Sequence, residues 1–367
     1  MTAEVVEVDD EARSRNEAMV DQLRTGGSLH DPAVEAAFRS VARHHFLPTL
    51  PLDDVYEDAA IPTKTGPSGQ PLSSSSQPAI MAVMLEQLRP LPGQRVLEVG
   101  AGTGYNAGIL AHLVGSCGRV VSLDYDEDIC ETARHNLAGA GLGGVDVIRA
   151  DGARGWDGGA PYDRIILTVG ADDVAPAWFD QLAPQGRLVL PLLLTGPIQL
   201  CVGFCKRDGR LESDTVTWCG FLPLRGELAP ASDPAAQGSP LVGDPRESGF
   251  ELPEQRMRGG FEPWLALSDP TYVRLTPDPA DPPTFGLRDT GGLAVVGKED
   301  EGAPILIYGS AQAAAERLAA AYRHWAQQQP AIERLRVAAL RNPADVLEPS
   351  EVRVFRRRHF TFLVRWP

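Results

Sequence analysis

Between residues 95 and 191 the chain alternates short apolar stretches with amphipathic ones, and this rhythm restricts the possible fold more than any other feature. The apolar stretches predict buried strands, and the stretches between them carry apolar side chains at helical spacing. The predicted strands are 95–99, 119–123, 145–148, 164–168 and 187–191, and the predicted helices are 105–114, 128–137 and 176–182. Strands and helices in this order form an α/β fold with a mostly parallel sheet that is covered on both faces.

A glycine-rich turn follows the first predicted strand. Residues 97–106 read Leu-Glu-Val-Gly-Ala-Gly-Thr-Gly-Tyr-Asn, which places Gly100, Gly102 and Gly104 in a GxGxG pattern. Glycines at such a turn let the backbone approach a bound ligand closely. The spacing differs from the GxGxxG pattern that binds a dinucleotide pyrophosphate. In addition, Glu98 stands where dinucleotide-binding domains usually carry an apolar residue.

Acidic residues follow the next two strands. Asp124 ends the strand 119–123, where a carboxylate can accept hydrogen bonds from both hydroxyls of a ribose. Asp151 and Gly152 follow the strand 145–148 and are placed to meet an adenine ring. Taken alone, Asp124 would also fit a surface turn. Together with Glu98 and the glycine turn, these residues predict a site for S-adenosylmethionine.

Composition excludes several kinds of partner and site. The formal net charge of −15 repels phosphate backbones, so nucleic acid is not the expected partner. Five cysteines in a chain of this length do not indicate a disulfide framework, and the pair Cys201 and Cys205 predicts core residues and no metal site. The N-terminus lacks the features of a signal peptide and no apolar run approaches ~20 residues. We therefore expect a cytoplasmic protein without membrane contact, and the oligomeric state stays open.

With these motifs in place, the sequence resembles the protein-L-isoaspartate O-methyltransferase family over residues 30 to 226. The segments that carry the resemblance are 41–44, 46–48, 56–58, 76–78, 97–106, 151–152, 162–166 and 182–189. The Ser-Gln-Pro element at Ser76, Gln77 and Pro78, ahead of the glycine turn, is the most distinctive of them. Most other methyltransferases of this fold lack it.

The resemblance implies a Rossmann-like, doubly wound, seven-stranded methyltransferase sheet with an N-terminal helical cap. It also implies methyl transfer from S-adenosylmethionine to the carboxylate of an isoaspartyl residue in a peptide or protein. The hydroxyl of Ser76 would then lie beside the transferred methyl group and the acceptor carboxylate. Ser75 and Gln77, together with Tyr105 and Asn106 after the glycine turn, would contact the substrate.

The implied chemistry requires positioning more than proton transfer. An aspartyl-type carboxylate with a pKa near ~4 is already ionised at neutral pH, so no general base is needed. Ser76 can orient a carboxylate oxygen, although the same serine also fits as the N-cap of a helix over 77–89. Arg43, His44 and Lys64 flank the predicted cleft and are the candidates for attracting the carboxylate. Each of them alone also fits a solvated surface.

Two features depart from the family. The family usually shows Thr-Ile-Ser-Gln-Pro, and here Ser75 replaces the apolar residue, which makes the pocket wall more polar or marks a solvated serine loop. The chain also continues from Gly226 to Pro367. This extension resembles those of actinobacterial members associated with ribosomally made peptides, in which a methylated aspartate closes to a succinimide (aspartimide). The alternative is an inert or dimerising extension.

The predicted organisation has four parts. They are N-terminal helices and a substrate cap (1–90), the S-adenosylmethionine-binding catalytic domain (91–226), a linker (227–259) and a smaller α+β accessory domain (260–367). The first part contains helices over 11–24, 31–42 and 77–89 and a loop over 47–73, and the second ends with antiparallel strands 199–206 and 213–222. The accessory domain contains strands 292–296, 304–308, 333–340 and 352–366 and a helix over 311–328.

An accessory domain with exposed strand edges can bind an extended peptide. The basic run from Arg353 to His359 either binds an acidic peptide or is a solvated strand edge. We therefore expect a carboxyl O-methyltransferase that acts on an aspartyl or isoaspartyl residue, with a preference for aspartate in a precursor peptide. General L-isoaspartyl repair and a non-catalytic cofactor-binding protein are the alternatives. A nucleic-acid methyltransferase fits poorly, because residues 167–171 lack the Asn/Asp-Pro-Pro-aromatic element.

Overall fold

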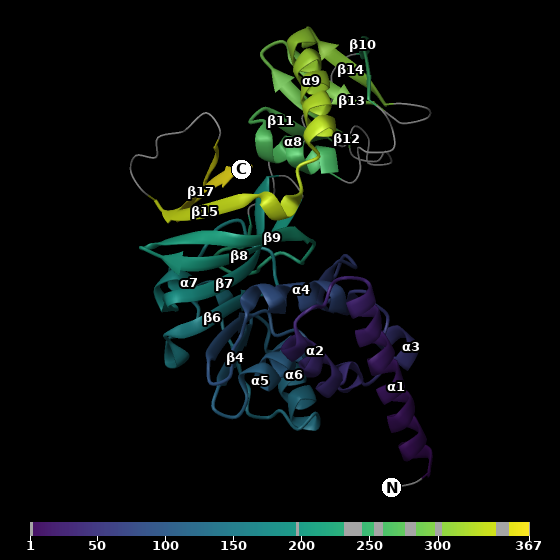
Figure 1. The fold of residues 1–367 in the computed structure, drawn as a ribbon, viewed down its shortest axis with the longest axis vertical. Helices are drawn as coiled ribbons and strands as arrows, with labels where there is room; N and C mark the ends of the chain where they lie inside the picture. The colour runs from purple at the N-terminus through teal and green to yellow at the C-terminus, as the bar shows by residue number, and fades with distance from the viewer. Residues whose placement is uncertain are drawn as a thin grey trace.

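The computed structural model describes residues 3–195, 198–230, 244–252, 260–275, 284–297, 303–342 and 352–366, with side chains from residue 10 onward. Figure 1 shows three layers along its long axis. The N-terminal helices lie at one end, the large sheet lies in the middle, and a smaller unit with its own sheet lies at the other end.

The N-terminal part consists of helices and one hairpin. Its elements are α1 (Ala3–Thr25), α2 (Pro32–Ser40), η1 (Arg43–Phe46), α3 (Leu52–Val55), β1 (Ile61–Thr65), β2 (Pro71–Ser75) and α4 (Pro78–Leu88). Asp31 caps α2 by accepting hydrogen bonds from the backbone N–H groups of Ala33 (2.7 Å) and Val34 (3.2 Å). The prediction of a loop over 47–73 is wrong where β1 and β2 pair. These strands are short and polar, so they carry no apolar alternation that could reveal them.

The central sheet confirms the predicted α/β fold. It has ten strands in the order β16-β17-β15-β9-β8-β7-β6-β3-β4-β5. Seven of them correspond to the implied sheet: β3 (Arg95–Val99), β4 (Arg119–Asp124), β5 (Asp146–Arg149), β6 (Tyr162–Leu167), β7 (Leu182–Thr195), β8 (Ile198–Arg207) and β9 (Arg210–Cys219). Strands β3 to β7 run parallel, β8 runs antiparallel to β7, and β9 runs antiparallel to β8. Asp208 and Gly209, both at positive φ, form the tight turn between β8 and β9.

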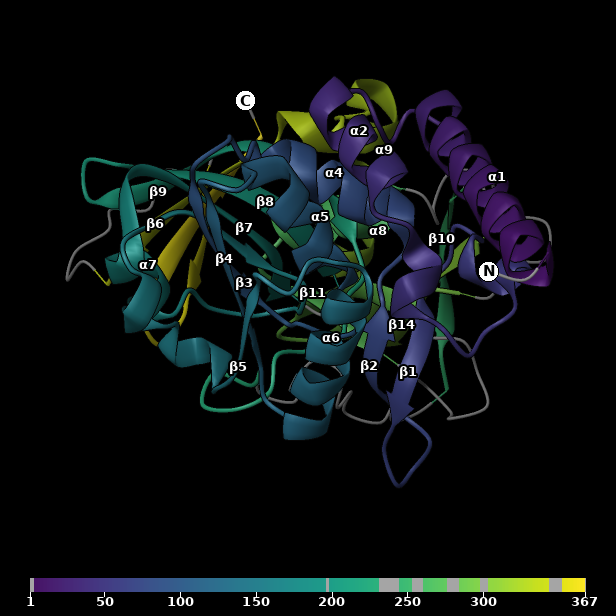
Figure 2. The same ribbon diagram turned by 90° about the horizontal axis from the view of Figure 1, so that it is seen from below.

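Helices cover both faces of this sheet. On one face, buried side chains of α1, α2, α4, α5 (Tyr105–Val114) and α6 (Glu127–Gly139) pack together. On the other face lie α7 (Pro176–Gln181) and parts of the C-terminal unit. Figure 2 shows α7 on the opposite side of the strands from α5 and α6. Because side chains alternate along β3, Val96 points towards the first face, whereas Leu97 and Val99 point towards the second.

The C-terminal unit is built on an antiparallel sheet. Its strands are β10 (Arg246–Leu252), β14 (Ala303–Gly309), β13 (Gly292–Val296), β12 (Thr284–Asp289) and β11 (Tyr272–Leu275), in this spatial order. Helix α9 (Gln312–Gln328) packs on it through Leu318, Tyr322 and Trp325, and α8 (Glu262–Ser268) lies between this unit and β7. The predicted strand pair and the predicted long helix are both confirmed.

The last three strands belong to the large sheet. Strands β15 (Arg336–Arg341), β16 (Arg353–Arg356) and β17 (Phe360–Arg365) extend it beyond β9, although we predicted these residues within the accessory domain. Arg357 fastens this extension, because its guanidinium donates hydrogen bonds to the carbonyls of Asp172 (2.9 Å) and Leu194 (2.5 Å). This residue of the basic run is thus part of the scaffold. No helix among the described residues is long and apolar enough to cross a membrane.

Candidate functional site

The turn after β3 has a backbone shape that only glycine adopts easily. Gly100, Gly102 and Gly104 have φ values of +106°, +52° and +90°. A Cβ atom at Gly100 would lie 2.4 Å from Oγ1 of Thr168, and one at Gly104 would lie 3.1 Å from the carbonyl oxygen of Ala133 on α6. The three glycines therefore allow the turn to pass closely between β6, α6 and the hairpin.

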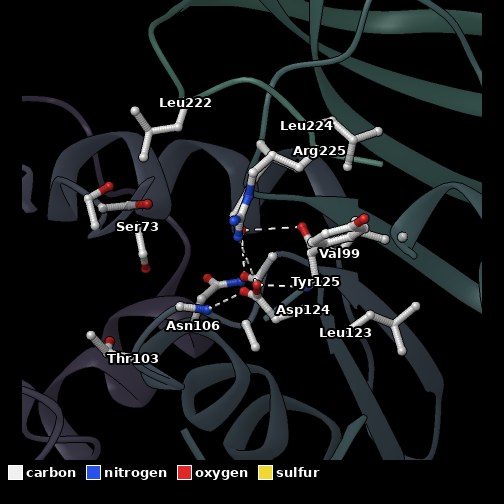
Figure 3. A pocket seen from close by; sticks show the side chains of 18 of the residues that line it. Ser73, Val99, Thr103, Asn106, Leu123, Asp124, Tyr125, Leu222, Leu224 and Arg225 are labelled. Carbon is white, nitrogen blue, oxygen red and sulfur yellow. Dashed lines mark hydrogen bonds and ion pairs between the residues drawn. The ribbon is translucent and has the colours of Figure 1, made fainter. Parts of the chain in front are cut away.

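A pocket lies over this turn. It encloses about 800 Å³, counting its open mouth, and its walls come from β2, the turn, the end of β4 and residues 222–225. Figure 3 shows Arg225 reaching into the pocket towards Asp124, with Ser73 on another wall. Eight of the predicted site residues line it: Ser75, Ser76, Gly100, Gly102, Tyr105, Asn106, Asp124 and Gly152.

Asp124 presents a carboxylate at the floor of the pocket. The backbone N–H groups of Gly102 (3.2 Å) and Tyr125 (2.8 Å) donate hydrogen bonds to it, and Nη2 of Arg225 lies 3.5 Å away. Burial raises the pKa of this carboxyl, while the N–H donors and Arg225 act in the opposite direction. Asp124 is thus a fixed hydrogen-bond acceptor that faces the pocket.

Ser76 lies where this pocket meets a second cavity. The second cavity, the acceptor cleft, encloses about 1310 Å³ including its open side, and Ser74, Ser76 and Leu222 line both spaces. Helix α4 begins at Pro78 with Gln77 as its N-cap, so the alternative role of Ser76 as N-cap is wrong. Ser76 is therefore available to both cavities.

Asp58 holds the start of α4. Its carboxylate accepts hydrogen bonds from the backbone N–H of Ala79 (2.8 Å) and from Nε2 of Gln77 (3.0 Å). Gln77 also lines the acceptor cleft. The segment that carries Ser76 is thereby fixed on its C-terminal side.

Arg43 is placed differently from the prediction. It is completely buried and lines neither cavity. Its guanidinium donates hydrogen bonds to the carbonyls of Val55 (2.9 Å), Glu57 (3.0 Å), Ala59 (3.1 Å) and Ser76 (3.0 Å) and to Oγ of Ser75 (3.4 Å). Both terminal nitrogens of this guanidinium are engaged by oxygens of the chain around Ser76, so Arg43 holds that chain in place and offers no exposed charge to a substrate.

The other two expected cations are also engaged. Nδ1 of His44 lies 2.7 Å from the hydroxyl of Tyr56, and burial raises the pKa of Tyr56 to about 12. Nζ of Lys64 on β1 contacts Asp126 and Asp128, each at 2.8 Å. Lys64 thus ties the hairpin to the start of α6.

Three predicted cofactor residues, Glu98, Gly104 and Asp151, do not line the pocket. Glu98 is fully buried and accepts hydrogen bonds from Nδ2 of Asn106 (2.7 Å) and from the hydroxyl of Ser122. Gly104 is the N-cap of α5. Asp151 accepts hydrogen bonds from the backbone N–H groups of Ala153 (3.0 Å) and Glu227 (2.8 Å). Glu98 thus orients a residue that does line the pocket, and Asp151 holds the chain beside Arg225.

Glu98 should make stability depend on pH. Burial raises its pKa to about 7, above its ordinary value of 4.5, so the folded state binds more protons between these values. The free energy of unfolding contributed by Glu98 therefore falls as pH rises through this window. Glutamine does not titrate, so the stability of Glu98→Gln does not fall in this way. We expect its free energy of unfolding, relative to that of the unsubstituted chain, to rise by about 2 kcal/mol from about pH 5 to about pH 8. Urea unfolding across this range measures the difference, and a difference that is flat with pH would contradict the raised pKa.

The sequence did not reveal several lining residues. Arg225 and Thr168 line the pocket, and so do residues 72–74 of the hairpin. Thr168 directly follows β6 at the same sheet edge as the glycine turn, and this position was the available signal. A single arginine after an apolar segment gives no such signal, because no partner stands at a fixed spacing. The described residues contain no cluster of His, Cys, Asp and Glu that could hold a metal ion.

Comparison with known proteins matches more than half of this chain to one family. The family model described as Protein-L-isoaspartate(D-aspartate) O-methyltransferase matches residues 14–229. The protein-L-isoaspartate O-methyltransferase of Methanopyrus kandleri is 36% identical over 216 residues, which cover 59% of this chain and 93% of that protein. The protein of the same name from Methanoculleus marisnigri is 39% identical over 225 residues, covering 61% and 96%.

Solved structures agree with this match. A protein-L-isoaspartate O-methyltransferase superposes with a TM-score of 0.56 and 30% identity, covering 88% of this chain and 96% of its own. This coverage exceeds residues 14–229, so the superposition extends into the C-terminal part. A Plasmodium falciparum structure in complex with S-adenosyl-L-homocysteine shares the fold, with a TM-score of 0.51 and 19% identity over 57% of this chain and 98% of its own. The chain therefore belongs to the protein-L-isoaspartate (D-aspartate) O-methyltransferase family.

Proposed function

We propose that this chain is an S-adenosylmethionine-dependent carboxyl O-methyltransferase that methylates isoaspartyl residues of peptides or proteins. The observation that carries the proposal is the position of Ser76, whose surroundings include both the glycine-turn pocket and the acceptor cleft. A group transfer needs a donor space and an acceptor space that meet at the reacting atoms. Family membership supports the same assignment.

The residues of the glycine-turn pocket fit the methyl donor. Asp124 supplies an acceptor for ribose hydroxyls, and Gly100 and Gly102 leave the backbone open to a ligand. The hydroxyl of Tyr105 is buried at the pocket and has no hydrogen-bond partner among the described residues, so a polar group of a ligand would satisfy it. When bound, S-adenosylmethionine supplies a methyl group that leaves its sulfonium sulfur for an acceptor oxygen.

The chain's own residues would then position the acceptor. An isoaspartyl carboxylate with a pKa near ~4 is ionised at neutral pH and needs no base. The hydroxyl of Ser76 donates a hydrogen bond to one carboxylate oxygen and leaves the other free to bond with the methyl carbon. Arg43 keeps the backbone of Ser76 in place through its carbonyl. Met81 and Leu222 contribute apolar walls that exclude water.

A finer candidate is aspartate methylation in a ribosomally made precursor peptide, followed by succinimide formation. The observation behind it is the folded C-terminal unit, which adds surface for a peptide. Because a solved protein-L-isoaspartate O-methyltransferase also superposes on part of this unit, the unit fits both candidates and the assay below decides between them. In the finer candidate the ester is an intermediate. The following backbone nitrogen attacks the ester carbonyl, the new C–N bond closes the ring, and methanol leaves.

Mass spectrometry with two acceptors separates these candidates. We expect methyl transfer from S-adenosylmethionine to a generic isoaspartyl peptide. Transfer only to a normal aspartate of a precursor peptide encoded beside the gene, ending one water lighter than the starting peptide, would establish the finer candidate. Absence of transfer to either acceptor would contradict both.

Ser76→Ala tests the proposed role of the hydroxyl. We expect kcat to fall by about 10- to 100-fold, because the carboxylate loses a positioned hydrogen bond in the transition state. The matched control is Ser116→Ala, since Ser116 is exposed and lines neither cavity. Equal kcat values for the two variants would remove Ser76 from the mechanism.

A further inference from the structure

Asp126, at the start of α6, uses its carboxylate to hold two cationic side chains. It is the N-cap residue of α6, yet its side chain accepts no capping hydrogen bond from the described residues of that helix. Instead, its Oδ2 accepts hydrogen bonds from Nζ of Lys64 and from Nη1 of Arg225, each at 2.8 Å. Burial acts to raise the pKa of Asp126, but these two hydrogen bonds outweigh it and lower the pKa, so the carboxylate is ionised at neutral pH.

Arg225 stands between Asp126 and Asp124. Its Nη1 lies 2.8 Å from Oδ2 of Asp126, whereas its Nη2 lies 3.5 Å from Oδ1 of Asp124. The longer contact is to the carboxylate that faces the pocket, and Figure 3 shows Arg225 pointing towards it. A small shift of the guanidinium would turn this longer contact into a second direct ion pair.

The side chain of Arg225 can make this shift while its backbone stays in place. Gly170 exchanges two backbone hydrogen bonds of 2.8 Å with the segment 222–224. On the other side of Arg225, the carboxylate of Asp151 accepts a hydrogen bond from the backbone N–H of Glu227 (2.8 Å). The chain is thus fixed before and after Arg225, and the long side chain is the part that can reorient.

Asp124 has few acceptor sites left for a ribose. Its Oδ1 accepts a hydrogen bond from the backbone N–H of Tyr125 (2.8 Å), and its Oδ2 accepts one from that of Gly102 (3.2 Å). The backbone N–H of Asp126 and Nη2 of Arg225 are both farther away, at 3.5 Å from Oδ1. A carboxylate has about four acceptor sites, so one site on each oxygen stays open to the two ribose hydroxyls while these contacts remain long.

A guanidinium drawn onto Asp124 would compete with the ribose. It would fill the open site on Oδ1, and the side chain of Asp124 is only 10% exposed. A charged hydrogen bond in such surroundings is stronger than one from a neutral hydroxyl group. Which of the two carboxylates holds Arg225 therefore decides how well the pocket accepts a nucleoside.

We propose that Asp126 is a positioning residue for the methyl donor: it holds Arg225 away from Asp124, so that Asp124 stays free for the ribose of S-adenosylmethionine. This inference rests on the proposed function, because it takes S-adenosylmethionine as the ligand of the glycine-turn pocket. It adds to that function a residue that acts through Arg225 and does not itself bind the ligand.

Asp126→Asn tests this role in isothermal titration calorimetry with the full chain. Asparagine is as good an N-cap as aspartate, so the substitution keeps the start of α6 and removes the charge that holds Arg225. We expect Kd to rise about 10-fold for S-adenosylmethionine and also for S-adenosylhomocysteine, because both ligands carry the same ribose. The double variant Asp126→Asn/Arg225→Met should regain most of this affinity, because the competing guanidinium is gone.

Asp128→Asn is the matched control. Asp128 is exposed and pairs with Lys64 at 2.8 Å, so this variant loses the same charge from the same helix and leaves Arg225 on Asp126. It should bind both ligands as the unsubstituted chain does. Urea unfolding shows whether each variant is folded under the conditions of the titration.

The outcomes separate this proposal from the proposed function. Unchanged Kd values in Asp126→Asn would overturn the role of Asp126. A loss for S-adenosylmethionine alone would also overturn it, because only the sulfonium responds to a missing negative charge. A loss that the double variant does not recover would show that Arg225 is not the competitor. If the unsubstituted chain bound neither ligand, the proposed function itself would fail.

Discussion

Gly100→Ala should weaken binding of S-adenosylmethionine by about 100-fold. At φ +106° an alanine is strained, and its Cβ would lie 2.4 Å from Oγ1 of Thr168. Thr168 cannot turn away without loss, because this hydroxyl donates a hydrogen bond to the carbonyl of Gly100 (2.7 Å). The turn must therefore shift towards the pocket. Isothermal titration calorimetry with S-adenosylmethionine and with S-adenosylhomocysteine measures the change.

Gly93→Ala is the matched control for this substitution. Gly93 has a φ of +82°, and a Cβ atom there would meet no atom within 4 Å. Both variants therefore carry left-handed strain, which costs about 1 kcal/mol of stability. Only Gly100→Ala should lose affinity. Unchanged affinity in that variant would mean that the donor binds elsewhere.

Arg43→Met should destabilise the fold by about 3–5 kcal/mol. The guanidinium donates hydrogen bonds to four backbone carbonyls, and methionine removes this donor from all of them. The carbonyl of Glu57 keeps a hydrogen bond from the backbone N–H of Ala59 (2.8 Å), and the other three lose the donor that the guanidinium supplied. Because one of these carbonyls belongs to Ser76, we expect kcat to fall as well. Urea unfolding gives the stability, and steady-state kinetics under conditions where the variant is folded give kcat and KM separately.

Arg119→Met provides the comparison for lost charge alone. Arg119 is about half exposed and pairs with Asp146 at 2.8 Å, and such a surface pair contributes at most about 1 kcal/mol. If Arg43 instead attracted the substrate carboxylate, Arg43→Met would leave the free energy of unfolding unchanged and raise only KM. That result would support the prediction made from the sequence.

The parts of the fold that could be predicted from sequence are those in which local pattern and burial agree. Strand β3 and helix α5 have the predicted bounds, because an apolar strand, a glycine turn and an apolar helix follow one another directly. Strands β15 to β17 show the opposite case. Their residues predict strands, but pairing of β15 with β9 joins positions far apart in the chain. Local periodicity carries no information about such a partner.

The residues of the site can also be divided into those that the sequence could predict and those that it could not. Gly100, Gly102 and Asp124 could be found because a bound nucleoside requires their residue types at the ends of β3 and β4. Glu98 was singled out as an acidic residue at an apolar position and Arg43 as a cation at the cleft, yet their partners are backbone carbonyls and neighbouring side chains that only the fold brings together. A charged residue in a family motif can therefore support the site from inside the core and never contact the substrate.

The position of β15 shows how the C-terminal unit is connected to the large sheet. Strand β9 pairs with β8 on one side and with β15 on the other, so the sheet resumes after the residues that form the small antiparallel sheet. In topological terms the small unit is an insertion into the catalytic sheet and not a tail attached to it. A chain cut after residue 229, where the family match ends, would expose the edge of β9. The ribosome must release the chain through β17 before the sheet is complete.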